Sequence, residues 1–163
     1  MKVVISDTSA LSALFRLDQL AILPKLYGKV IIPPAVFAEL MKLESLGFQT
    51  TPLQQASWLS VLAPARRDMV EELMHTLDAG EAEAITLARE QQADLLIIDE
   101  MQGRKVAAEM NLPVIGLLGV LLEAKQKGHV PALKPLMQSL KSIGFFISPS
   151  LYTLVLQQVG EAN

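Results

Sequence analysis

The chain lacks cysteine, so its 163 residues can form neither disulfide bonds nor thiolate metal sites. A chain of this length can bury a hydrophobic core without such cross-links. We therefore expect one domain over residues 1–163, with a core at 1–130 and a C-terminal helical extension at 131–163. The lack of cysteine is compatible with a reducing compartment, and we expect a cytoplasmic location.

A long uninterrupted apolar run is also missing. The richest apolar stretch, Leu112–Leu122, is broken by Pro113, Gly116 and Gly119. It is shorter than the roughly 20 apolar residues that a membrane-spanning helix needs. The N-terminal MKVVISD leads directly into a candidate strand and an acid, without a cleavage signal. We therefore expect no membrane segment.

The chain has no excess of positive charge, because it contains 14 basic and 17 acidic residues and its net charge is −3. This balance argues against a protein that is held to nucleic acid by bulk charge. It does not exclude a nuclease, since metal ions can supply the positive charge that phosphate needs. Any nucleic acid should then bind weakly without metal.

Short apolar runs alternate with longer amphipathic segments along the chain. Candidate strands occupy Lys2–Ser6, Gly28–Ile32, Trp58–Leu62, Asp94–Ile98, Pro113–Ile115 and Phe145–Ile147. Candidate helices occupy Thr8–Phe15, Asp18–Leu26, Pro34–Leu43, Gln54–Ser57, Asp68–Thr76, Gly80–Gln91, Gln102–Met110, Leu117–Gln126, Leu133–Ile143 and Pro149–Val159. Strands separated by helices imply parallel crossovers and a sheet covered on both faces, which is an α/β fold.

Two acids follow directly after candidate strands, Asp7 after the first and Asp99 after DLLII. In parallel α/β folds, ligands bind beyond the carboxyl ends of the strands. Each acid also has a structural alternative, because Asp7 could cap the helix that begins at Thr8, and Asp99 the helix around Gly103. Both interpretations remain open.

Polar neighbours could support either acid. Thr8 or Ser9 could cap the first helix in place of Asp7, or could hold a metal-bound water or orient the Asp7 carboxylate. Glu100 offers a second carboxylate beside Asp99.

Two further acids are expected on helices. Glu39 borders a largely apolar helix face, where an acid is often a solvated edge residue. Glu81 shares a face with apolar residues such as Ile85, which is the side that should pack, whereas Glu83 lies on the other side. The spacing Asp78-x-x-Glu81 also fits a capping box, in which Glu81 reaches back to Asp78.

Together the four acids, Asp7, Glu39, Glu81 and Asp99, describe a candidate metal site. Carboxylate oxygens suit hard cations such as Mg²⁺ and Mn²⁺, and Mg²⁺ takes only one or two protein carboxylates plus waters and phosphate oxygens. Such ions lower the pKa of a bound water and stabilise the departing oxygen of a phosphodiester. Without metal the acids should repel one another.

Four segments of the chain, DTSALSAL, PPAVFAEL, LDAGEAEAI and LLIIDEMQGRKVAAEMNLPVIGLLGVLLEAK, resemble the PIN domain. More closely, they are similar to small prokaryotic PIN-like proteins related to VapC-type toxin ribonucleases, over about residues 1–130. The resemblance implies a three-layer α/β/α fold around a central parallel sheet of four to five short strands. It also implies a metal-dependent endoribonuclease that hydrolyses RNA with one or two Mg²⁺ or Mn²⁺ ions. The catalytic residues and metal ligands would be Asp7, Glu39, Glu81 and Asp99.

Two features depart from the family pattern. The third family acid is usually an aspartate, and here the longer Glu81 stands at that position. The acid after the DLLII strand usually lies in a short polar turn, whereas this chain has DEMQGR. Arg104 in that segment could bring a guanidinium near phosphate, or could form a surface ion pair.

The resemblance also implies partners: single-stranded RNA, an antitoxin protein and a second copy of the chain in a homodimer. The apolar tail from Pro131 to Val159 could be ordinary core cover, or a surface for a dimer or a protein inhibitor.

The alternative function is a PIN-like nucleic-acid-binding or regulatory module that is catalytically weak or inactive. The sequence contains no P-loop, GxGxxG motif or nucleophile elbow. An aspartate-phosphate enzyme is disfavoured because no second aspartate stands two residues after Asp7.

Overall fold

The computed structural model describes residues 2–162 and contains a five-stranded parallel sheet. The strands are β1 (Val4–Ser6), β2 (Val30–Ile32), β3 (Leu59–Val61), β4 (Leu95–Ile97) and β5 (Val114–Ile115). Their order is β3-β2-β1-β4-β5, so the chain extends the sheet first on one side of β1 and then on the other. The carboxyl ends of β1 and β4 therefore meet where the strand order reverses, which is the usual place for a ligand in such sheets.

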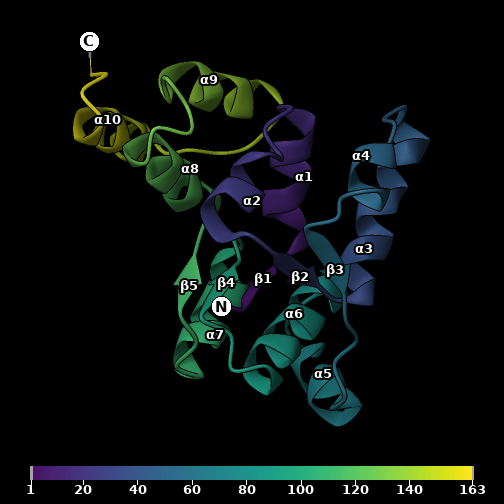
Figure 1. The fold of residues 1–163 in the computed structure, drawn as a ribbon. Coiled ribbons are helices and arrows are strands. Elements are labelled where there is room, and N and C mark those ends of the chain that lie inside the picture. Colours follow the sequence, from purple (N-terminus) through teal and green to yellow (C-terminus); the bar gives the residue numbers. More distant parts are fainter. Residues whose placement is uncertain (1, 163) are drawn as a thin grey trace.

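Helices connect the strands and cover the sheet (Figure 1). The helices are α1 (Thr8–Arg16), α2 (Ile22–Tyr27), α3 (Pro34–Met41), the 3₁₀ helix η1 (Lys42–Leu46), α4 (Thr51–Gln54), α5 (Arg67–Leu73), α6 (Ala79–Glu90), α7 (Met101–Glu109), α8 (Leu117–Gln126), α9 (Lys134–Ser142) and α10 (Pro149–Gln158). Each of the first four strands is followed by at least one helix before the next strand. This alternation produces the parallel connections that the sequence predicts.

The two faces of the sheet belong to two separate core clusters. Val4 and Ile97 pack with apolar residues of α1, α2 and α8 in the larger cluster. Ile5 and Leu96, one position away in each strand, pack with α6 and α7 in the smaller one. Successive side chains of a strand point to opposite faces, so both faces are covered by helices. The predicted three-layer α/β/α fold is confirmed.

The two C-terminal helices pack on the same side of the sheet as α1. Their buried residues, Met137, Leu140, Val155 and Leu156, belong to the larger core cluster. Figure 1 shows α8, α9 and α10 gathered at one end of the molecule, in green to yellow. Leu151 and Leu154 of α10 remain exposed. In residues 2–162, no helix combines the length and the apolar character needed to cross a membrane.

Two local predictions are wrong. Phe145–Ile147 forms no strand but an extended connection between α9 and α10. Ile147 is buried in the larger core cluster and Phe145 packs against that cluster, whereas Phe146 is exposed, and none of the three pairs with the five strands. The short helix expected at Gln54–Ser57 instead occupies Thr51–Gln54. Pro52 lies in its first turn, where a missing backbone N–H costs nothing.

Helix α6 is buried on nearly all sides, which makes Glu83 a structural residue. Expected opposite the packing face, Glu83 is only 8% exposed. Its Oε1 accepts a hydrogen bond from the backbone N–H of Ala35 at 2.9 Å, and its Oε2 pairs with Nη1 of Arg67 at 2.8 Å. Glu83 thus ties α6 to the first turn of α3 and to α5.

We expect Glu83→Ala to lower the free energy of unfolding by about 2 kcal/mol, because the N–H of Ala35 loses its acceptor. The matched variant Arg67→Ala removes the other half of the ion pair but should cost less than about 1 kcal/mol, since Arg67 is exposed. Urea unfolding of the two variants checks this difference. If both variants lose the same free energy of unfolding, the bond from Glu83 to the N–H of Ala35 is not the main contribution of Glu83 to stability.

Candidate active site

Asp7 directly follows β1 and is only 2% exposed. Both of its carboxylate oxygens accept hydrogen bonds from the backbone. Oδ1 accepts from the N–H of Ala10 at 3.2 Å, which makes Asp7 the N-cap of α1. Oδ2 accepts from the N–H of Asp99 at 3.0 Å, which joins the ends of β1 and β4. The predicted capping role is therefore confirmed, and the carboxylate has a fixed orientation.

Asp99 lies beside Asp7, two residues after β4, and is half-buried. Its alternative role as the cap of α7 is wrong, because Glu100 occupies that position and makes no side-chain cap bond. Instead, Oδ1 of Asp99 accepts a hydrogen bond from the N–H of Leu117, the first residue of α8, at 3.0 Å. This bond draws the connection between β5 and α8 to the site.

Glu81 uses its two carboxylate oxygens differently. Its own N–H donates to Oδ1 of Asp78 at 2.8 Å, and its Oε1 lies 3.4 Å from the N–H of Asp78, so the predicted capping box is formed. Oε2 is buried and has no hydrogen-bond partner in the described part of the chain. One oxygen therefore serves the helix, and the other remains available to a ligand.

Glu39, on α3, faces the start of α6. A Cβ atom at Gly80 would lie 2.8 Å from Oε1 of Glu39 and 3.2 Å from Oγ1 of Thr8. The Thr8 Oγ1 atom is buried and, like Oε2 of Glu81, has no partner within residues 2–162. The missing side chain at Gly80 therefore leaves space for both oxygens to approach the same point.

A second glycine makes room for Glu81. Gly103 lies in the first turn of α7, and a Cβ atom there would lie 2.7 Å from Oε2 of Glu81. Helices α6 and α7 therefore approach each other closely beside the strand ends. Sequence reasoning missed this role of Gly80 and Gly103, although the glycine directly before Glu81 in the helix start GEAEAI is a local signal.

The structure brings the four predicted acids to one edge of the sheet, but not into one tight cluster. Asp7 and Asp99 are in direct contact, whereas Glu39 and Glu81 approach from α3 and α6. Among residues 2–162, no three acidic or histidine side chains are close enough to hold a metal ion together. Any ion here would be held by few protein oxygens directly.

Burial gives two of these acids unusual pKa values. Burial raises the pKa of Asp7 to about 7, helped by the negative charges of Asp99 and Glu100 and opposed by its two backbone hydrogen bonds. Burial also raises the pKa of Glu81 to about 7, with contributions from Asp78 and Glu100. Both carboxyl groups can therefore change protonation state near neutral pH.

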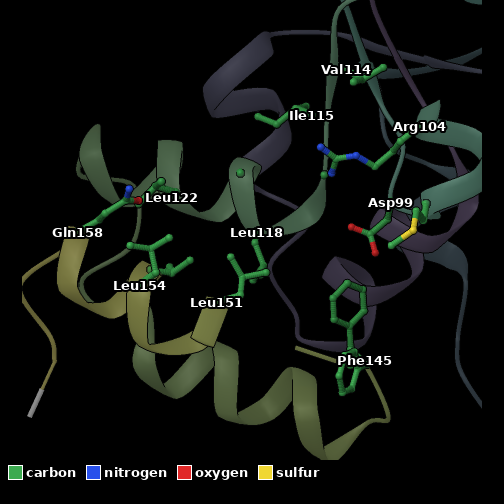
Figure 2. A pocket seen from close by; sticks show the side chains of 15 residues that line it. Asp99, Arg104, Val114, Ile115, Leu118, Leu122, Phe145, Leu151, Leu154 and Gln158 are labelled. Atoms are coloured by element: carbon green, nitrogen blue, oxygen red, sulfur yellow. The ribbon is translucent and has the colours of Figure 1, made fainter. Parts of the chain in front are cut away.

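The supporting residues differ in what they contact. Arg104 lies with its guanidinium Nη1 next to Gly116, close to Oδ1 of Asp99 (Figure 2). It forms no ion pair with any residue from 2 to 162, so the surface ion-pair alternative is wrong for this part of the chain. Glu100 is exposed and acts on Asp7 and Glu81 through its charge. The Ser9 hydroxyl makes no hydrogen bond to Asp7.

Comparison with known protein families gives one clear result. A family profile described as a PIN domain matches residues 3–161, which is nearly the whole chain. A search of curated proteins gives no match.

The raised pKa of Asp7 predicts a loss of stability as the pH rises in metal-free solution. Between the ordinary pKa of 3.8 and the folded value of about 7, the folded protein keeps a proton that the unfolded chain has lost. The free energy of unfolding should therefore fall by roughly 2–3 kcal/mol from pH 5 to pH 8 through Asp7. Asp7→Asn cannot ionise at this position, so the variant should lose the contribution of Asp7 and retain only that of Glu81, whose pKa is also raised to about 7. Urea unfolding with a chelator at both pH values measures this, and an unchanged pH dependence in the variant would refute it.

Proposed function

The chain belongs to the PIN-domain family, and we propose that it is a metal-dependent endoribonuclease that hydrolyses RNA phosphodiester bonds. The observation that carries the proposal is that two buried oxygens have no hydrogen-bond partner in residues 2–162: Oγ1 of Thr8, the residue after Asp7, and Oε2 of Glu81. Buried polar atoms almost always have partners, so two such atoms on residues next to the predicted acids or among them support an additional ligand. Carboxylate and hydroxyl oxygens are donors that suit Mg²⁺ or Mn²⁺.

In this proposal Asp7, Glu39, Glu81 and Asp99 hold one or two ions, directly or through water, and Thr8 adds a neutral oxygen. Mg²⁺ commonly takes only one or two protein carboxylates and keeps several waters. The wide spacing of the four acids is compatible with that mode of binding. When bound, the ion supplies positive charge for the phosphate and lowers the pKa of a water molecule.

The chain's own residues contribute orientation, proton exchange and charge. The Asp7 carboxylate is held by two backbone N–H groups, so it needs no reorganisation when a ligand arrives. The pKa of Glu81, near 7, suits a group that takes up and releases a proton at neutral pH. The guanidinium of Arg104, which forms no ion pair within residues 2–162, lies beside Asp99, where it can bind a phosphate oxygen.

A second candidate is a PIN-like module that binds nucleic acid or regulates a partner without cleaving. One observation favours it: no three acidic side chains in residues 2–162 are close enough to hold an ion together. In such a module the acids are structural, as the bonds from Asp7 to Ala10 and Asp99 already allow.

Asp7→Asn distinguishes the two functions. If the chain is an endoribonuclease, it should cleave single-stranded RNA in the presence of Mg²⁺ or Mn²⁺, and a chelator should stop the cleavage. Asp7→Asn should lower the cleavage rate by roughly a hundredfold or more, because it removes a buried charge that binds the ion. Gel analysis of a labelled RNA measures the rate.

The control is Glu72→Gln, which changes an exposed acid on α5 and should leave cleavage unaffected. RNA that remains uncut with both metals, together with an Asp7→Asn variant that binds RNA as the natural chain does, would leave the binding module as the function.

Gly80→Ala tests the position of Glu39 without removing any acid. The added methyl group would displace Oε1 of Glu39, the mobile end of a side chain, so the fold should keep its stability. The α6 helix should gain roughly a few tenths of a kcal/mol from the alanine. Cleavage should nevertheless fall roughly tenfold, since the carboxylate moves away from Thr8. An unchanged cleavage rate with an intact thermal transition would exclude Glu39 from the metal site.

A further inference from the structure

A hollow of about 690 Å³ opens directly beside Asp99, between β5, α8 and α10. Figure 2 shows Asp99 and Arg104 at one end of the hollow and Leu154 and Gln158 at the other. Most of its wall is apolar, and Leu118 of α8 faces Leu151 of α10. The hollow therefore combines an apolar floor with one unpaired cation and the edge of the acidic site.

A second hollow of about 210 Å³ lies along α1, on the other side of Phe145. Its wall carries the hydroxyl groups of Ser9 and Ser12 and the guanidinium of Arg16. Phe145 lines both hollows, so the two are adjacent. Both begin near the acidic edge, because Ser9 belongs to the helix that Asp7 caps and Asp99 lines the larger hollow.

Each hollow is lined by one arginine, the larger by Arg104 and the smaller by Arg16. Neither Arg16 nor Arg104 forms an ion pair with a residue from 2 to 162. Arg16 is held in place by the ring of Phe48, with its guanidinium carbon 5.4 Å from the ring centroid. At the mouth of the larger hollow, the ring of Phe146 is 82% exposed.

We propose that the two hollows form one binding track for an unpaired RNA strand. The larger hollow receives a single base, which stacks on Phe146, while Arg104 binds the phosphate next to Asp99. Ser9, Ser12 and Arg16 bind the sugar–phosphate backbone beyond Phe145. This inference rests on the proposed function, because the larger hollow is lined by Asp99 of the acidic edge, so a strand bound there reaches the predicted acids.

The chemistry of the hollows favours a single strand over other occupants. A base in a duplex has both faces covered by its neighbours, so only an unpaired base can enter an apolar hollow and stack on an aromatic ring. A polyanion supplies a negative charge for each arginine at its regular phosphate spacing. A helix of a second copy of this chain would fill the apolar wall but would give no reason for an arginine in each hollow that forms no ion pair within residues 2–162.

The test measures the affinity of a fluorescent single-stranded RNA of about ten nucleotides, by anisotropy with Mg²⁺ and in an Asp7→Asn background that prevents cleavage. Phe146→Ala should weaken binding roughly tenfold, since one base loses its stacking partner. Arg16→Gln and Arg104→Gln should each lower the slope of log affinity against log salt by about 0.7. The same RNA annealed to its complement should bind at least about tenfold more weakly than the single strand.

Matched controls come from surfaces outside the track. Leu46→Ala removes another exposed apolar side chain, and Arg89→Gln removes an exposed arginine at the far end of α6. Neither change should alter affinity or salt dependence. Because Phe146, Arg16 and Arg104 are exposed, thermal unfolding should be nearly unchanged in their variants as well.

The outcomes separate this inference from the proposed function. Binding that depends on Phe146 and both arginines supports the track even where the natural chain cleaves no RNA. If the natural chain cleaves RNA but the three substitutions leave RNA affinity unchanged, the proposed track is wrong and the proposed function stands. Equal affinity for duplex and single strand, or no binding of the single strand, also overturns it. A Phe146→Ala variant that loses self-association but keeps RNA affinity assigns the hollow to a second copy of the chain.

Discussion

The hydrogen bond from the N–H of Asp99 to the carboxylate of Asp7 holds the central part of this structure together. Asp7 also binds the N–H of Ala10 at the start of α1, and Asp99 binds the N–H of Leu117 at the start of α8. A single series of bonds therefore links two strands and two helices that are far apart in the sequence. The acids that characterise the site are also the residues that close the fold at this edge.

This double role has an electrostatic cost. Asp7 is desolvated and lies near Asp99 and Glu100, so its charged form is disfavoured and its pKa rises to about 7. A neutral side chain at this position would satisfy the cap of α1 without that cost. In the proposed metal site, a bound cation would remove this cost, because its positive charge would favour the charged form of Asp7.

Sequence reasoning placed the strand-end acids correctly because their positions follow from simple rules. Buried parallel strands are short apolar runs, and Asp7 and Asp99 come directly after two of them. The capping spacing of Asp78 and Glu81 is equally local. The contact of Glu83 with Ala35, the space left by Gly80, and the irregular path of Phe145–Ile147 all depend on how distant helices pack. Periodicity carries no information on such long-range contacts, which is why these features were missed or wrong.

The C-terminal segment with helices α9 and α10 contributes both to the stability of the core and to the candidate site, although the sequence suggested a core at 1–130 and a separate extension at 131–163. The buried side of α10, with Val155 and Leu156, completes the larger core, while its exposed side forms a wall of the hollow beside Asp99. An acidic chain with a net charge of −3 repels a polyanion, so a ribonuclease of this kind would need local features that hold RNA near the carboxylates. In the proposed binding track, Arg16, Arg104 and the apolar wall would meet that need at short range, where a stacked base and a paired phosphate would outweigh the long-range repulsion that salt screens. The packing of α10 against the core therefore shapes the surface on which the acids can act.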